Sequence, residues 1–152
     1  MALSTTRLNK ILWSNDVTKN IFYGTYPSCM IPKSNKSVYA FITNTDDHKN
    51  PGEHWNSWFV RNNKLIFFDS FGRKPDDSDF PLYYHKLAKT YNQIEYNRTP
   101  IQAWDAFTCG HFCIHFIYVL SLGLEIKHFI GDYFKSLSEN DIKVIDFINS
   151  II

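Results

Sequence analysis

A glutamine and a cysteine stand seven positions apart in the second half of this 152-residue chain, and both residue types can do chemistry. Gln102 comes first, and Cys109 is followed by Gly110 and a nearly all-apolar run, which predicts a buried helix. At a helix N-terminus, unpaired N–H groups and the positive end of the dipole favour the charged form of a cysteine. That form, the thiolate, is the nucleophile, so Cys109 is a candidate nucleophile.

A nucleophilic cysteine needs a base, and histidine is the usual one because its unperturbed pKa is about 6.5. Among the six histidines, His54 opens a predicted strand directly after a glycine-containing loop. The Asn-Asn pair at 62–63 predicts a tight turn that joins strands 55–61 and 64–69. In that antiparallel pair the start of one strand lies beside the end of the other, which makes His54 and Asp69 neighbours. Asp69 would then hold the imidazole in one tautomer.

The chemistry also needs donors for a developing oxyanion. Gln102 can offer its side-chain amide, next to the backbone N–H of Cys109, and losing one such donor costs roughly 2.7–4 kcal/mol. Three residues beside His54, namely Gly52, Glu53 and Trp55, are candidates for lining a substrate cleft. For the last two, a solvated carboxylate and a packed aromatic are the more common interpretation.

Other interpretations of these residues are open. A lone cysteine in an apolar segment is most often a small buried hydrophobe, and Cys113, inside the predicted helix, fits that description. The alternation of cysteine and histidine over 109–115 could suggest a metal site. Residues two apart on a helix do not share a face, and no second cluster with zinc spacing follows, so we expect no metal. The reactivity of Cys29 cannot be predicted.

Composition narrows the class of protein. Sixteen basic and 15 acidic residues give a net charge of +1, far from that of a dedicated nucleic-acid binder. Residues 1–75 carry a net charge of +5 and residues 76–152 a net charge of −4, which permits an anionic partner on the first half. Three cysteines argue against a disulfide framework and for a reducing compartment. With no apolar run of about 18 residues and no signal-peptide core, we expect an intracellular protein without membrane contact.

The elements that would position these residues follow from periodicity and turn residues. A single domain over residues 1–152 suits this length. The pattern predicts a first helix that is capped by Ser4 or Thr5 and has Leu8, Ile11 and Leu12 on its apolar face. It then predicts a loop over 20–32, a strand over 38–43, the hairpin, a helix over 80–91, a strand over 94–97 and the central helix. A last helix starts near Ser138, and its predicted apolar stripe is Ile142, Ile145, Phe147 and Ile148. This order predicts an α+β fold, with a mainly antiparallel sheet packed on the helix that carries Cys109.

Together these residues resemble the adenain family, the adenovirus-type cysteine endopeptidases, over most of the chain. The resemblance rests on the segments FYGTYP, YAFITNT, GEHW and IFFDSFG, and on Gln102 seven residues before a Cys-Gly-x-Phe-Cys motif. It implies the cysteine-protease fold shared with proteases of ubiquitin-like proteins. It also implies that Cys109, His54, an acid and Gln102 are catalytic. The acid is Asp69 here, where adenovirus enzymes commonly have Glu.

The resemblance further implies cleavage of viral precursor proteins at small, glycine-containing sites during virion maturation, by a monomer in the infected cell and the virion. It implies an activating peptide and DNA as cofactors. However, residues 80–101 contain no cysteine to hold the peptide, and a net charge of +1 argues against DNA. Two alternatives are an isopeptidase that removes ubiquitin or a related modifier, and a non-catalytic binding module on the same fold.

Overall fold

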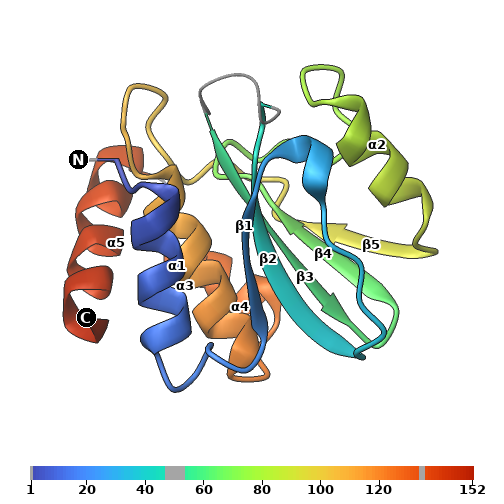
Figure 1. Cartoon of the computed structure of the whole chain (residues 1–152). Coiled ribbons are helices and arrows are strands. Elements are labelled where there is room, and N and C mark those ends of the chain that lie inside the picture. The colour runs from blue at the N-terminus through green and yellow to red at the C-terminus, as the bar shows by residue number, and fades with distance from the viewer. Residues whose placement is uncertain (1, 47–53, 134–135) are drawn as a thin grey trace.

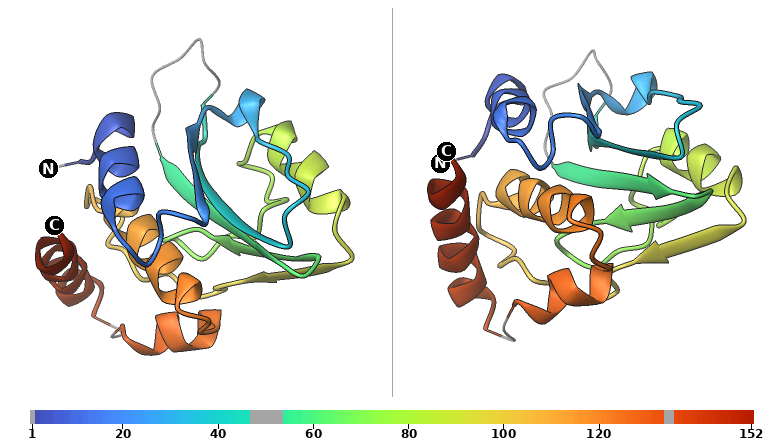
Figure 2. Two further views of the ribbon diagram at one scale, coloured as in Figure 1. Left: turned by 60° about the horizontal axis from the view of Figure 1, so that its bottom comes forward. Right: turned by 90° about the horizontal axis from the view of Figure 1, so that it is seen from below.

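The computed structural model describes residues 2–46, 54–133 and 136–152 of the chain. A five-stranded sheet in the order β1-β2-β3-β4-β5 has four helices on one face and one helix on the other (Figure 1, Figure 2). The elements are α1 (Thr5–Ser14), β1 (Phe22–Tyr26), a 3-10 turn (Ser28–Met30), β2 (Val38–Asn44), β3 (Trp55–Arg61), β4 (Lys64–Phe68), α2 (Leu82–Lys89), β5 (Gln93–Tyr96), α3 (Cys109–Ser121), α4 (Ile126–Gly131) and α5 (Leu137–Ile151). The predicted α+β class is confirmed.

The sheet is antiparallel at its centre and parallel at both edges. Strand β3 pairs antiparallel with β2 and β4, whereas β1 runs parallel to β2 and β5 runs parallel to β4. The turn between β3 and β4 is the predicted one, because Asn62 and Asn63 both have positive φ angles, of 50° and 67°. This turn sets a register in which Ser57 lies opposite Phe68, so the start of β3 meets the end of β4.

Helix α3 is the buried centre of the molecule. Ten of its 13 residues are buried, because β3, α1, α4 and α5 pack around it (Figure 2). The main core lies between this helix and the sheet, and a second core of aromatic side chains lies between the sheet and α2. Among the described residues, no helix combines the length and apolarity that crossing a membrane requires.

The predicted loop over 20–32 was wrong, and the last helix is present but begins earlier than predicted. The segment 20–32 contains β1, which the sequence hides because Gly24 interrupts the alternation and the pairing to β2 is irregular between Phe22 and Thr25. Helix α5 starts at Leu137, one residue before the predicted cap.

The buried stripe of α5 also differs from the prediction. It is formed by Asn140, Val144 and Ile148, whereas Ile142 is 64% exposed and Ile145 is 36% exposed. Of the four predicted residues, Ile148 is buried and Phe147 packs against the core, so the prediction was wrong only for Ile142 and Ile145.

Candidate active site

His54 and Asp69 are brought together by the β3–β4 hairpin. His54 directly precedes β3 and Asp69 directly follows β4, and the Nε2 atom of His54 lies 2.6 Å from Oδ1 of Asp69. The imidazole also stacks on the ring of Phe71, with 5.1 Å between the ring centroids. A fully buried carboxylate and a stacked ring therefore fix the orientation of His54.

Besides His54, two further residues hold the carboxylate of Asp69. Asn56 donates a 3.0 Å hydrogen bond to its Oδ1, and Arg73 donates from Nε and from its backbone N–H to Oδ2, at 2.8 and 3.1 Å. Burial raises the pKa of Asp69, but the hydrogen bonds and charges of His54 and Arg73 outweigh this and lower it to about 2. The carboxylate is therefore charged across the physiological range.

Three partners of Asp69 were not predicted from the sequence, namely Asn56, Arg73 and Asn97. The side chain of Asn97 donates to the backbone carbonyl of Asp69 at 2.7 Å and accepts from its N–H at 3.2 Å. The hairpin register could have indicated Asn56, since it occupies the position that continues the pairing opposite Asp69. Nothing in the sequence indicates Asn97, which lies just beyond the neighbouring edge strand.

Cys109 begins α3 and contacts the imidazole of His54. The backbone N–H groups of Trp55 and Gly110 lie near enough to its sulfur to favour the thiolate and lower the pKa of the thiol. Burial raises the pKa of the Cys109 thiol, but the hydrogen bond and charge of His54 dominate and the net shift is downward. Burial likewise lowers the pKa of His54, yet Asp69 and Cys109 together raise it to about 9. These opposite shifts favour a thiolate–imidazolium pair at neutral pH.

The side-chain amide of Gln102 is held at both ends. Its Oε1 accepts a 2.5 Å hydrogen bond from the hydroxyl of Ser70, and its Nε2 donates to the carbonyl of Ala106 at 2.9 Å. A backbone carbonyl only accepts, so the nitrogen must face Ala106, which fixes the amide orientation. The second Nε2 hydrogen remains for another acceptor, as an oxyanion donor requires.

Helix α5 holds the segment between Gln102 and Cys109. The hydroxyl of Thr108 donates to Oδ1 of Asp141 at 2.5 Å, and the side chain of Asn140 donates to the carbonyl of Ile101 at 3.1 Å. Asn140 is fully buried, which explains why a polar residue occupies the core stripe of α5. The last helix thus fixes both ends of this segment.

Of the three predicted cleft residues, Gly52 and Glu53 lie outside the described part of the chain. Trp55 is half-buried and donates from Nε1 to the carbonyl of Leu3 at 3.2 Å. A Cβ atom on Gly110 would lie only 3.2 Å from Cδ1 of Trp55, so a glycine after the nucleophile allows this close packing. Trp55 therefore packs against the start of α3, and its backbone N–H contributes to the lowered pKa of the Cys109 thiol.

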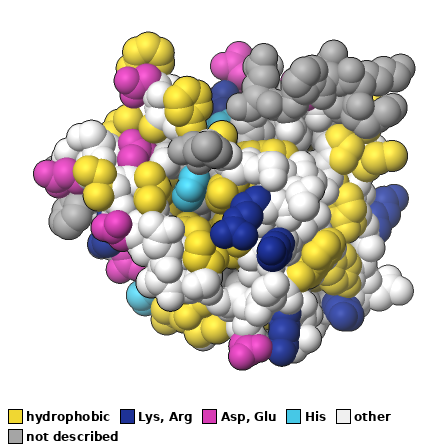
Figure 3. All heavy atoms as spheres, turned by 60° about the vertical axis from the view of Figure 1, so that its left-hand side comes forward, with side chains coloured by type: hydrophobic (Ala, Val, Ile, Leu, Met, Phe, Trp, Pro, Cys, Tyr) yellow, Lys and Arg dark blue, Asp and Glu magenta, His cyan; other side chains and the backbone are white. Residues whose placement is uncertain are grey.

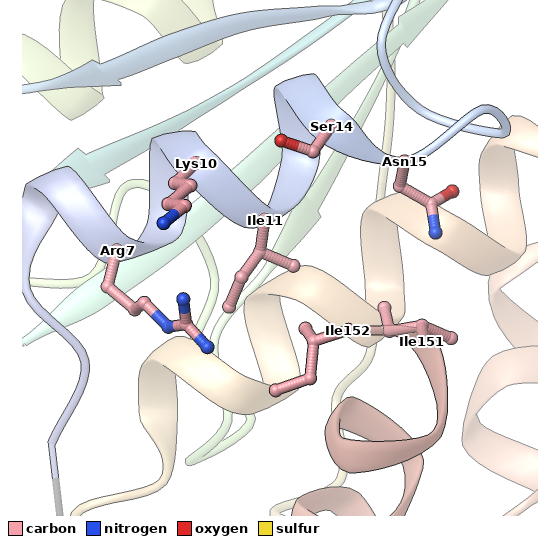
Figure 4. Close-up of a pocket in the computed structure, with 7 residues that line it drawn as sticks. All are labelled: Arg7, Lys10, Ile11, Ser14, Asn15, Ile151 and Ile152. Atoms are coloured by element: carbon pink, nitrogen blue, oxygen red, sulfur yellow. The ribbon is translucent and has the colours of Figure 1, made fainter.

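The two histidines of α3, His111 and His115, are not part of this site. His115 hydrogen-bonds through Nδ1 to the hydroxyl of Tyr133, and burial lowers the pKa of both His111 and His115 to about 4. In the described part of the chain, no group of three or more His, Cys, Asp or Glu side chains is arranged to hold a metal. A cavity of about 530 Å³ between α1 and the end of α5 holds none of the candidate catalytic residues (Figure 4).

Comparison with known proteins gives two viral relatives. The chain is 29% identical over 120 residues to "Putative thiol protease R355" of Acanthamoeba polyphaga mimivirus, a match that covers 72% of this chain and 39% of that protein. It is 32% identical over 108 residues to "Uncharacterized protein V9" of Sputnik virophage, covering 57% of this chain and 61% of that protein. The chain thus matches about four-tenths and six-tenths of their lengths. The first match confirms the predicted resemblance to a viral cysteine protease.

No family model matches the chain. Two solved structures are similar in part: the ASFV pS273R protease (18% identity, TM-score 0.42, covering 74% of this chain and 44% of that one) and the SUMO protease Ulp1 (16% identity, TM-score 0.40, covering 72% and 50%). Because both TM-scores lie below 0.5, these two likenesses do not bear on activity or substrate.

Proposed function

We propose that this chain is a cysteine endopeptidase with Cys109 as its nucleophile. The observation that carries the proposal is the position of His54: its Nε2 lies 2.6 Å from Oδ1 of Asp69, and the imidazole is close enough to Cys109 to lower the pKa of the thiol. A base placed between a thiol and a buried acid is the arrangement that activates nucleophiles in acyl transfer. The similarity to a viral protein named as a thiol protease supports the same chemistry.

In the proposed reaction, the Cys109 thiolate attacks the scissile carbonyl carbon, and the carbonyl π electrons move onto oxygen. The second Nε2 hydrogen of Gln102 and the backbone N–H of Cys109 donate to that oxyanion. The imidazolium of His54 then protonates the leaving amine, the C–N bond breaks, and a thioester remains. His54, now neutral, takes a proton from water, which attacks the thioester and releases the acid and the Cys109 thiolate. Asp69 stays charged throughout and orients His54.

As substrates we propose viral precursor proteins cut at small, glycine-containing sites, in the infected cell or the virion, by an adenain-like monomer. The two viral relatives support this setting. The proposed reaction steps use only side-chain and backbone groups of this chain, and neither DNA nor an activating peptide enters them. The runner-up substrate class is a ubiquitin-like modifier joined through a C-terminal glycine, which the same chemistry would cleave.

A cleavage assay tests the proposal. The wild-type chain, Cys109→Ala and the matched control Cys29→Ala are incubated with the structural precursor proteins of the source virus, and separately with ubiquitin-derived fluorogenic substrates. We expect the wild type and Cys29→Ala to cut the precursors and Cys109→Ala to be inactive. Cleavage of the ubiquitin substrates alone would replace viral precursor proteins by ubiquitin-like modifiers as the substrate class. If the wild type cleaves neither substrate, the result would contradict an enzymatic role. Running each reaction with and without DNA tests the cofactor.

A further inference from the structure

Two large aromatic side chains are exposed on the segment between Gln102 and Cys109. Trp104 is 86% exposed and Phe107 is 71% exposed. Most other large aromatic side chains of the described residues lie in the two cores or pack against them. Exposing a tryptophan and a phenylalanine three residues apart leaves apolar area in water, which is typical of a binding surface.

The segment that carries them is fixed in place. The N–H of Ala106 donates to the carbonyl of Ala103 at 3.0 Å, which closes a turn, and Gln102 donates across this turn to the carbonyl of Ala106. Asp141 of α5 accepts from the hydroxyl of Thr108 at 2.5 Å. The two aromatic side chains therefore project from an ordered turn, and a ligand that binds them would not have to order the loop.

The aromatic side chains also stand beside the proposed chemistry. Trp104 is two residues after Gln102, and Phe107 is two residues before Cys109. The turn that carries the two aromatics therefore joins the proposed nucleophile to the proposed oxyanion donor. Because consecutive Cα atoms are about 3.8 Å apart, two residues of chain separate each aromatic from a proposed catalytic residue by at most about 7–8 Å, which is about two to three residues of an extended substrate.

The charge of this region is negative. Asp105 lies between the two aromatics, close enough to Asp141 for their charges to interact. Figure 3 shows Asp and Glu side chains together with hydrophobic ones gathered over α5, and Lys and Arg gathered over α1. The basic residue on this part of α5, Lys143, contacts the carbonyl of Asp132 and the ring of Tyr133 on the α4 side. A partner with positive charge would be complementary.

We propose that Trp104 and Phe107, with Asp105 between them, bind a substrate segment that carries a bulky apolar side chain next to a Lys or Arg within about three residues of the scissile bond. This inference rests on the proposed function: the small, glycine-containing residues stand at the scissile bond itself, and the bulky apolar and basic residues stand further along the substrate. The aromatic rings supply apolar contact, and Asp105 supplies the charge that selects the basic residue.

Cleavage-site profiling tests this inference. Peptides from a denatured proteome, produced by cleavage after Glu so that Lys and Arg remain internal, are incubated with the wild type, with the double variant Trp104→Ala/Phe107→Ala, and with Asp105→Lys. The matched control is Leu122→Ala, since Leu122 is 53% exposed at the far end of α3. Alkylation of Cys109 by iodoacetamide is measured on every variant, because it needs the nucleophile but no substrate side chain.

We expect wild-type cleavage sites to be enriched in large apolar residues beside Lys or Arg. The double variant should lose the apolar enrichment and about tenfold or more in kcat/KM on such peptides, with unchanged alkylation. Asp105→Lys should lose the basic enrichment and weaken the dependence of KM on salt. The control should match wild type.

Three outcomes would overturn the inference. Wild-type cleavage without this enrichment would contradict it while leaving the proposed function intact, as would an unchanged profile in the double variant. A dimer that dissociates when the two aromatics are replaced, with cleavage unaffected, would assign the surface to a second copy of this chain. An absence of any cleavage by wild type would contradict the proposed function and the inference with it.

Discussion

The hydroxyl of Ser70 donates a 2.5 Å hydrogen bond to Oε1 of Gln102, which stands 32 residues further along the chain. Ser70 directly follows Asp69, so two consecutive residues at the end of β4 hold the imidazole and the proposed oxyanion donor. The backbone carbonyl of Ser70 also accepts from the N–H groups of Ile101 and Gln102, at 2.9 and 3.2 Å. The end of β4 thus positions His54 and Gln102 relative to each other.

The first prediction concerns this link. Ser70→Ala leaves Oε1 of Gln102 without its donor, and we expect kcat/KM for a cleaved peptide to fall about three- to tenfold, in line with one neutral hydrogen bond. Gln102→Ala should cost about 10²–10³-fold, because it removes the donor itself. Alkylation of Cys109 forms no oxyanion and should not change in either variant. Ser78→Ala, at an exposed serine, is the control, and equal losses in both assays would show that Ser70 supports the fold instead.

The second prediction concerns the orienting acid. In Asp69→Asn the negative charge that raises the pKa of His54 is gone, so that pKa should fall from about 9 and the alkaline limb of the pH–rate profile should move to lower pH. We expect kcat/KM to fall by at least about 10²-fold at neutral pH, because the imidazolium form is no longer favoured. Asp79→Asn changes an exposed carboxylate and should leave the profile unchanged. An unshifted alkaline limb would remove Asp69 from the mechanism.

The third prediction concerns the dependence of rate on pH. The proposed active form has a charged Cys109 and a charged His54, so kcat/KM should rise as the thiol ionises and fall as pH passes about 9. The alkylation rate needs only the thiolate, and it should show the acidic limb without the alkaline fall. An alkaline limb shared by both reactions would mean that the fall comes from unfolding, which circular dichroism over the same pH range would detect.

The fourth prediction concerns stability. Burial lowers the pKa of His115 to about 4, so the unfolded chain binds more protons than the folded one below pH 6.5. The free energy of unfolding should therefore fall as pH drops through 6.5 and level off below about 4, by about 3 kcal/mol for this residue. His115→Gln should remove that part of the slope in urea titrations at several pH values. An unchanged slope would contradict a neutral buried imidazole.

His54 acts with the opposite sign. Its folded pKa is raised to about 9, so its contribution to stability is full below pH 6.5 and is lost as pH rises through about 9. Asp69, with its pKa lowered to about 2, contributes above pH 3.8 and loses that contribution as pH falls through about 2. Among these titratable groups, the histidines of α3 therefore lower the free energy of unfolding near pH 5. The contributions of His54 and Asp69 do not change at that pH.

The sequence was sufficient for the hairpin and for the pair it creates. Two consecutive asparagines that accept positive φ specify one turn, and one turn fixes which residues of β3 and β4 meet. His54 and Asp69 could therefore be placed side by side without coordinates. The contact of His54 with Cys109 is different, because it depends on how α3 packs against the sheet, and no local pattern contains that information.

The residues that the sequence did not reveal act over long separations. Asn140 reads as an exposed helix residue, yet it is fully buried and holds the carbonyl of Ile101, 39 positions earlier. Ser70 and Arg73 follow Asp69 in a segment whose sequence is typical of an ordinary turn. Nothing in that segment indicates that Ser70 donates to Gln102 or that Arg73 donates to Asp69. Strand β1 was missed because its edge pairing depends on the main chain, and Gly24 breaks the apolar alternation.

The most direct measurement of the central claim is the rate at which iodoacetamide alkylates Cys109 at neutral pH, with and without His54. In a Cys29→Ala background, mass spectrometry assigns the modified residue, and Cys113 is buried out of reach. We expect fast, stoichiometric labelling of Cys109 in the parent and at least a tenfold slower rate in His54→Ala, because removing the imidazole raises the pKa of the thiol. Equal rates in the two proteins, or a parent that labels no faster than a free cysteine, would contradict the activation of Cys109 by His54.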